Sequence, residues 1–257
     1  MRFNVLASGS SGNCTLIEAG STVLLVDCGL PLAELARRLS IAGVALDLIS
    51  SVLVSHEHTD HIKGLPALCK HLKIPVHISR RALEAVQSLR SLSLGEDLKS
   101  GSPIEIGRLK VTPIAVPHDS ADPMAFKFEH EGSVLAIVTD LGHIPKSVSS
   151  HLTGCDALVI ESNHDTDKLR NGRYPWTVKT RILSPIGHLS NEATARFLKD
   201  NFDGKARHII LAHLSKENNH PALASIKAEE ALAARNRIFD YDLRVALPDS
   251  PLGWIEL

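Results

Sequence analysis

The sequence predicts an α/β fold in which two mixed β-sheets pack together and helices cover their outer faces. Short apolar runs rich in β-branched residues recur along the chain, and most end in Gly, Asp, Ser or His, as strands do. Segments with helical spacing of apolar residues lie between some of these runs, which is typical of layered α/β folds. Neither a low-complexity linker nor a repeat of about 20–50 residues divides the chain. We therefore expect a single domain over residues 1–257.

The expected strands are short, and most contain four to six residues. They lie at residues 3–7, 15–18, 22–26, 52–54, 76–78, 111–116, 134–138, 158–160, 209–211 and 244–247. A hairpin turn is expected at residues 129–133, directly before the strand that starts near residue 134.

Four helices are expected from apolar positions at helical spacing. The first covers residues 32–39 and follows Pro31, a favourable first-turn residue. The others cover residues 81–89, 192–197 and 222–234.

The composition excludes several classes of protein. A hydrophobic fraction of 44% argues against disorder, and 28 basic against 29 acidic residues argue against a chain that is basic throughout. The four cysteines are widely spaced without a C-x-x-C pair, which indicates reduced intracellular thiols. Asn4 and Ser8 lie where a signal peptide would need an uninterrupted apolar run. No stretch approaches the ~18 apolar residues that a membrane span needs. We expect a soluble cytoplasmic protein without membrane contact.

The stretch VSHEHTDH holds the densest group of metal-competent side chains. His56, His58, Asp60 and His61 follow an apolar run, where a buried strand is expected to end. Crowded imidazole and carboxylate groups are costly there unless something binds them. These donors suit zinc, iron, manganese or cobalt, and the lack of cysteine disfavours a closed structural zinc site. Because four potential ligands are more than one ion takes from so short a loop, two ions are expected; the alternative is a solvated polar loop.

Three further metal-competent residues lie at the ends of other expected strands. They are His118, Asp140 and His213. Ligands at strand ends converge on one edge of a sheet, which is a rigid place to hold ions. Taken singly, His118 could be a turn residue, Asp140 a helix cap and His213 a core histidine.

This pattern resembles the metallo-β-lactamase superfamily, in which H-x-H-x-D-H precedes a strand-end histidine, aspartate and histidine. The resemblance covers nearly the whole chain. It implies a four-layer αβ/βα sandwich with two mixed β-sheets, outer helices and a metal site along one sheet edge. Carried over residue by residue, it assigns His56, His58 and His118 to one ion, Asp60, His61 and His213 to a second, and Asp140 to both.

Four further motifs resemble the YycJ/WalJ group of this superfamily, described as metal-dependent 5′-to-3′ exonucleases acting on DNA. They are ASGSSGN at 7–13, ESNHD at 161–165, GHLSN at 187–191 and HLSKENN at 213–219. The HLS portion also resembles the late ligand motif of ribonuclease Z enzymes, so an RNA-processing nuclease is a lesser alternative. His220 departs from the pattern and rivals His213 as the last ligand. We favour His213, because it ends a strand whereas His220 lies in a loop.

A basic stretch with two aromatic residues independently favours a nucleic-acid substrate. Five basic residues and no acidic one occur between positions 168 and 181, namely Lys168, Arg170, Arg173, Lys179 and Arg181. Cations neutralise phosphates and aromatic faces stack on bases, so Arg173, Tyr174 and Trp176 are predicted to bind a single strand that passes over the metals. Alternatively, the aromatic residues anchor a loop and the charges form a solvated helix face.

Two loops are predicted to contact substrate phosphate. Ser10, Ser11 and Asn13 lie in a small Ser/Gly loop that can present backbone N–H groups, although the loop can also be a simple turn. Ser190 or Asn191 is expected to cap the following helix, whose N-terminus favours an anion.

Two more histidines are assigned to the site. His188 is the candidate donor of a proton or hydrogen bond to the departing oxygen, with a plain loop histidine as the alternative. His164 is counted with the substrate-binding residues. Together with Asp165 it supports a metal ligand, or the pair caps the following turn.

The resulting hypothesis is a metal-dependent phosphodiesterase, in first place a 5′-to-3′ exonuclease on single-stranded or 5′-phosphorylated DNA. Two divalent ions per chain, of zinc, manganese or iron, would share Asp140 and a bridging water and lower its pKa until hydroxide exists near neutral pH. Asp60 would bind an ion and also hold that water.

Three rival functions share these residues. A small-molecule metallohydrolase acting on a thioester, lactone or β-lactam uses the same ligands, although no separate substrate domain follows the core. A nucleic-acid-binding scaffold with degenerate chemistry is opposed by the full set of seven ligands. A redox di-iron site lacks room for a second cofactor domain within 257 residues.

Overall fold

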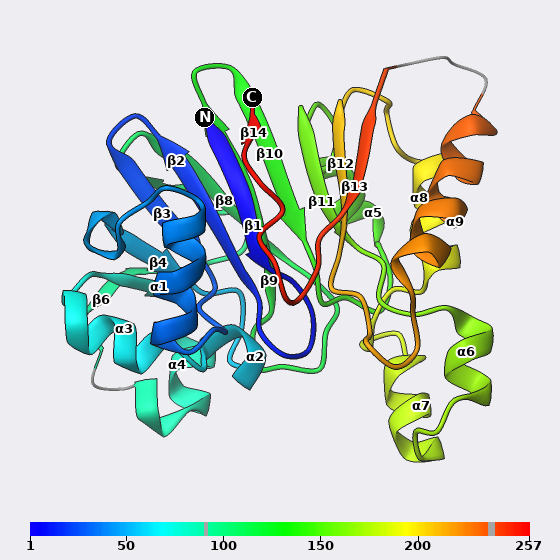
Figure 1. The fold of residues 1–257 in the computed structure, drawn as a ribbon, viewed down its shortest axis with the longest axis horizontal. Helices are drawn as coiled ribbons and strands as arrows, with labels where there is room; N and C mark the ends of the chain where they lie inside the picture. The colour runs from blue at the N-terminus through cyan, green and yellow to red at the C-terminus, as the bar shows by residue number, and fades with distance from the viewer. Residues whose placement is uncertain (90–91, 236–239) are drawn as a thin grey trace.

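The computed structural model describes residues 1–89, 92–235 and 240–257 and contains two β-sheets with flanking helices (Figure 1). The strands of the first sheet are β1 (Arg2–Ala7), β2 (Cys14–Ala19), β3 (Thr22–Val26), β4 (Ser51–Leu53), β5 (Val76–Ile78), β6 (Leu94–Asp97) and β14 (Ile255–Glu256). The strands of the second are β7 (Ile104–Ile106), β8 (Leu109–Ala115), β9 (Met124–His130), β10 (Ser133–Val138), β11 (Ala157–Glu161), β12 (His208–Ala212) and β13 (Asp242–Val245).

The two sheets have the same plan. Their strand orders are β14-β1-β2-β3-β4-β5-β6 and β13-β12-β11-β10-β9-β8-β7. In each sheet a run of four strands is parallel, from β3 to β6 in the first and from β10 to β13 in the second. Parallel strands end at the same edge, so the loops after them gather there. The predicted pair of mixed sheets is confirmed.

An apolar core lies between the sheets. Phe3 and Leu24 from the first sheet pack with Phe126, Phe128 and Ile210 from the second, and all five are buried. Strand side chains alternate between two faces, so the opposite faces need a cover of their own. The helices supply it on the outside of each sheet (Figure 1).

Helices flank both sheets of this sandwich. They are α1 (Leu32–Ile41), α2 (Thr59–Ile62), α3 (Leu65–Leu72), α4 (Arg80–Ala85), α5 (Lys146–His151), α6 (Thr166–Asn171), α7 (Trp176–Ile182), α8 (Asn191–Asp200) and α9 (Pro221–Ala233). Figure 1 shows α1 and α3 beside the first sheet, α8 and α9 beside the second, and α6 with α7 projecting at the lower right. No helix among the described residues is long and apolar enough to cross a membrane.

The expected elements are largely present, with differences at short or polar segments. The helix expected over residues 81–89 is wrong as one element, because it breaks at Val86, whose backbone is extended, and a 3-10 turn Gln87–Leu89 follows. The hairpin turn is confirmed, with Ser133 paired to His130. The strands absent from the sequence prediction are β6, β7, β9 and β14, and β6 has the sequence LGED, which lacks apolar alternation. The helices absent from it are α2, α3, α5, α6 and α7; all but α3 have seven residues or fewer, which is under two helical turns.

Candidate metal centre

The metal-competent residues meet where strands of both sheets end. His56 and His58 follow β4, and Asp60 and His61 lie on the short helix α2 that begins directly after them. The remaining three follow the second sheet's strands β8, β10 and β12; they are His118, Asp140 and His213. The structure therefore brings together all seven residues named from the sequence. Their roles as ligands stay predictions.

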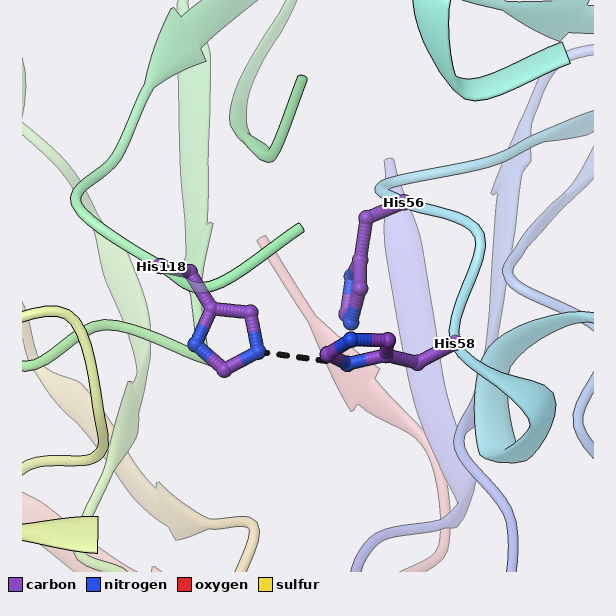
Figure 2. A group of neighbouring side chains, drawn as sticks. All are labelled: His56, His58 and His118. Carbon is purple, nitrogen blue, oxygen red and sulfur yellow. Dashed lines mark hydrogen bonds between the residues drawn. The ribbon is translucent and has the colours of Figure 1, made fainter. Parts of the chain in front are cut away.

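Three histidines form one group, shown in Figure 2. The Nδ1 of His58 and the Nε2 of His118 are 3.3 Å apart, and the rings point toward each other from different loops. The ring centroid of His56 lies 4.6 Å from that of His58 and 5.1 Å from that of His118. Each offers one ligand atom, all within 4.8 Å of one another. This spacing suits a single cation between the three rings.

A second group consists of Asp60, His61 and His213. The Nε2 atoms of His61 and His213 lie 3.5 and 3.6 Å from Asp60 Oδ2. Asp140 lies beside both histidines, with its carboxylate oxygens 3.4 Å from His61 Nε2 and 3.3 Å from His213 Nδ1. It also groups with His56 and His61 within the reach of one ion. Asp140 thus occupies the position between the two groups that a shared ligand requires.

Several ligand atoms of these groups are buried without a hydrogen-bond partner. They are His56 Nε2, Asp140 Oδ2 and His213 Nε2. A buried polar atom without a partner costs free energy, which a bound cation would recover. The donor set of imidazole nitrogens and carboxylate oxygens therefore fits zinc, iron or manganese.

The backbone is strained at three residues around the site. Asp27, Asp140 and His213 have positive φ values of 61°, 59° and 56°, a backbone conformation that residues other than glycine rarely adopt. Each directly follows the end of a strand or lies within two residues of it. Such strain clusters at functional sites, where it aims a side chain that ordinary turns would direct elsewhere.

Asp27 is a site residue that the sequence analysis did not name. Its Oδ2 lies 2.8 Å from His61 Nδ1, and its Oδ1 accepts the Ser55 backbone N–H at 2.8 Å. The contact orients the ring so that Nε2 faces Asp60 and Asp140. Burial opposes the charged ring, but Asp27 and Asp140 raise the pKa of His61 to about 9. Asp27 directly follows β3 in the motif DCG, so the strand-end reasoning used for the other residues would have found it.

Glu161 is the second residue that sequence reasoning missed, although it begins the ESNHD motif. This fully buried carboxylate ends β11, and its Oε1 lies 2.9 Å from His188 Nδ1 and 2.7 Å from His213 Nδ1. Its Oε2 accepts the backbone N–H of Leu141 and of Leu189. Burial favours neutral groups here, yet Glu161 helps to raise the pKa of both histidines, and their charges lower its own pKa.

Burial favours the neutral form of two other histidines at the site. Burial lowers the pKa of His56 well below its usual value, and neighbouring imidazoles reinforce the effect. Burial also lowers the pKa of His118, whose Nδ1 lies 3.1 Å from the Gly187 carbonyl oxygen. Neutral imidazole is the form that binds a cation. His61 and His213, which carry protons in the metal-free site, must release them on binding.

The Ser/Gly loop between β1 and β2 divides into two parts. Ser10 and Ser11 are exposed, so their predicted contact with substrate phosphate is sterically open. Asn13 is buried, and its Nδ2 donates to Asp60 Oδ2 at 3.1 Å and lies 3.0 Å from His61 Nε2. The Gly9 N–H donates to Oδ1 of Asn13. Both ends of the Asn13 amide therefore bond to neighbouring residues of the site.

Two predicted substrate-binding side chains are closed to a substrate. His164 and Asn191 are each only 1% exposed. Asn191 Oδ1 accepts from Ser162 Oγ and Asn219 Nδ2, so its side chain braces the loops of the site. This burial arises because the strand-end loops pack over both side chains, and it argues against the predicted direct contact with substrate. Burial lowers the pKa of His164 to about 4.

The turn around Ser190 behaves as expected. Ser190 Oγ accepts the Ala193 N–H at 3.1 Å and caps α8, and Asp165 caps α6 in the same manner. His220, the rival ligand, caps α9 through its Nδ1 and groups with no metal-competent residue in the described chain. The preference for His213 is therefore supported.

The basic stretch forms the projecting pair α6 and α7, with Arg173 exposed, Tyr174 half-buried and Trp176 68% exposed. Two of its five basic residues are not available to a strand. Lys179 is buried and donates to the Arg170 carbonyl oxygen, and Arg181 pairs with Asp119 beside the metal-competent His118. The remaining three have no ion pair with any described residue and stay open to phosphate; they are Lys168, Arg170 and Arg173.

An αβ/βα sandwich with histidines and aspartates gathered at the strand ends of one edge defines a protein of the metallo-β-lactamase fold. Its family follows from comparison with known sequences. The family model described as the beta-lactamase superfamily domain matches residues 22–214, and the chain belongs to this family.

Its relatives are similar over most of their length. The chain is 37% identical over 236 residues to exodeoxyribonuclease YycJ of Bacillus anthracis, which covers 90% of this chain and 89% of that protein. It is 30% identical to exodeoxyribonuclease WalJ of Streptococcus pneumoniae, covering 95% and 93%. Among solved structures, the metallo-beta-lactamase fold protein YhfI from Bacillus subtilis superposes with a TM-score of 0.75 at 18% identity, covering 97% and 98%. The latter likeness shows the fold alone.

Proposed function

We propose that this protein is a metal-dependent phosphodiesterase that removes nucleotides from the 5′ end of a DNA strand. The observation behind the proposal is the joined set of histidines and aspartates centred on Asp140, in a chain 37% identical to a protein named exodeoxyribonuclease. The single-domain organisation of residues 1–257 stays a prediction, supported by the core that both sheets share.

Two divalent ions per chain fit the two groups of donor atoms. His56, His58 and His118 would hold one ion, and Asp60, His61 and His213 would hold the second. Asp140 would contact both. When bound, such ions neutralise charge on the phosphate oxygens and make water a stronger nucleophile near neutral pH. Zinc, manganese and iron all suit these donors.

His188 would supply the proton that the departing 3′ oxygen needs. Water replaces the 3′ oxygen of the terminal nucleotide at phosphorus, and the departing oxygen needs a proton. Glu161 holds Nδ1 of His188 and, although burial opposes it, raises the pKa of that ring. The ring therefore stays protonated to higher pH than it would without Glu161, and Nε2, which does not contact Glu161, would donate the proton to the departing oxygen.

The nucleic acid would reach this centre along the projecting helices α6 and α7. A single strand offers unpaired bases to Trp176 and Tyr174, and its phosphates to Arg173. These two helices form an arm, and the ion pair of Arg181 with Asp119 joins the arm to the loop that carries His118. The exposed Ser10 and Ser11 lie on the loop that leads to Asn13 and would contact the terminal phosphate.

A substrate panel tests this proposal against its rivals. Metal-stripped protein is reloaded separately with zinc, manganese and iron, then given single-stranded DNA with and without a 5′ phosphate, RNA, a thioester and a lactone. The proposal predicts mononucleotide release that is fastest from 5′-phosphorylated DNA. Turnover of the thioester or lactone without cleavage of any nucleic acid would instead establish a small-molecule hydrolase.

A further inference from the structure

A separate cleft of about 580 Å³ lies between α5 and α8. Its apolar lining consists of the partly exposed side chains of Ile144 and Ala193 and of the almost fully buried Leu189 and Phe197. Lys146 and Arg196 stand at its rim, and the hydroxyl of Ser149 also lines it. None of the residues grouped as metal-competent lines this cleft, so it is distinct from the metal centre.

The chemistry of the cleft favours an anion with a flat apolar part. No acidic residue is among the described residues that line it. Lys146 and Arg196 form no ion pair with any described residue, so both charges are available to a ligand. The planar guanidinium group of an arginine matches the geometry of a phosphate. The apolar side chains of Ile144 and Ala193 offer a surface for an aromatic ring. The volume lies within the range of about 300–1,000 Å³ usual for small-ligand sites.

One lining residue of the cleft, Leu189, belongs to a segment that also contacts the metal centre. Leu189 N–H donates to Glu161 Oε2 at 2.9 Å, and the neighbouring His188 lies 2.9 Å from Glu161 Oε1. Two residues earlier, the Gly187 carbonyl oxygen lies 3.1 Å from His118 Nδ1. One short segment, residues 187–189, therefore contacts both the cleft and the metal centre.

We propose that this cleft binds a nucleotide unit, with its base against Ile144 and Ala193 and its phosphate between Lys146 and Arg196. The choice of a nucleotide rests on the proposed function, while the anionic and aromatic character of the ligand rests on the lining itself. The nucleotide has two possible sources. It is either the mononucleotide that the reaction releases or a further nucleotide of the substrate strand.

Direct binding tests the cleft without any turnover. Thymidine 5′-monophosphate and a 5′-phosphorylated pentathymidylate are titrated calorimetrically into the full-length protein. The same titrations use two cleft variants: Lys146→Ala/Arg196→Ala, and Ser149→Phe, which fills the cleft and keeps both cations. The matched control is Lys70→Ala/Arg81→Ala, which removes two exposed cations from helices of the other sheet. Circular dichroism verifies the fold of each variant.

The double cleft variant should bind thymidine monophosphate at least about tenfold more weakly, because charged hydrogen bonds to phosphate are lost. The Ser149→Phe variant should show a similar loss, and the control should bind like the wild type. A loss confined to the monophosphate assigns the cleft to released product; a parallel loss with pentathymidylate assigns it to the strand. Either result supports the proposal.

No binding of either nucleotide by the wild type would overturn the proposal, and so would wild-type affinity in a folded cleft variant. These outcomes are independent of hydrolysis. A protein that binds the monophosphate in the cleft but cleaves no nucleic acid would refute the proposed function alone. A protein that cleaves DNA but shows unchanged binding in the cleft variants would refute the cleft alone.

Discussion

Replacing Glu161 by glutamine removes one buried negative charge and keeps the shape of the side chain. In the wild type this charge lies within hydrogen-bond distance of Nδ1 of both His188 and His213. Hydrogen bonds to charged groups contribute about 1.5–3 kcal/mol. If this stabilisation is needed in the transition state, its loss lowers kcat/KM by about ten- to a hundredfold.

The variant should also change the pH profile. Glu161 opposes the effect of burial and raises the pKa of His188, so the wild-type ring stays protonated to higher pH than an ordinary histidine. Without this charge the pKa falls, and the ring loses its proton at lower pH. A general acid must be protonated, so the alkaline limb of kcat/KM should move to lower pH in Glu161→Gln.

The assay is hydrolysis of 5′-phosphorylated DNA from about pH 6 to pH 10 at saturating metal. Because Glu161 also contacts the metal-competent His213, bound metal is measured in the same samples. The control is Glu192→Gln, which removes a carboxylate that bonds to Thr166 and touches neither histidine. An alkaline limb that stays in place in Glu161→Gln, with full metal content, would refute the role of the Glu161–His188 pair.

Three further variants test the metal centre and the arm. Asp140→Asn should lose bound metal and lower the activity more than about a hundredfold, which exceeds the usual effect of replacing a residue that only orients a metal ligand. Near-normal metal content together with near-normal activity would contradict this. Asp27→Asn should weaken metal affinity by about 10–100-fold in a chelator competition, because the ring of His61 loses its orienting carboxylate. Trp176→Ala should weaken single-stranded DNA binding by about 1–3 kcal/mol without changing the melting temperature, whereas Ile226→Ala, also exposed, should change neither.

The seven metal-competent residues could be named from the sequence because their positions follow one rule. Each lies just after an apolar strand, and parallel strands bring their ends to one edge whatever the details of the loops. Asp27 and Glu161 also lie at strand ends, but they are not among the seven ligand positions that the resemblance assigns. They were missed because one carboxylate at the end of a strand looks like a turn residue until its histidine partner is known.

The direction of polar side chains was harder to predict. Asn191 and Lys179 lie in polar, loop-rich stretches, yet both are buried and bonded to neighbouring segments. Which side of a short helix faces the body depends on contacts with distant parts of the chain, such as Asn219 against Asn191. Composition shows that a stretch is basic, but only packing decides which of its charges remain open to a ligand.

The central claim is that the centre around Asp140 cleaves DNA from the 5′ end. The most direct measurement follows two single-stranded substrates, labelled at the 5′ or the 3′ terminus, during digestion by metal-loaded protein. The account predicts immediate release of a labelled mononucleotide from the 5′-labelled strand and gradual shortening of the 3′-labelled strand, both absent in Asp140→Asn. Intact strands with every metal tested, or equal cleavage by Asp140→Asn, would contradict it.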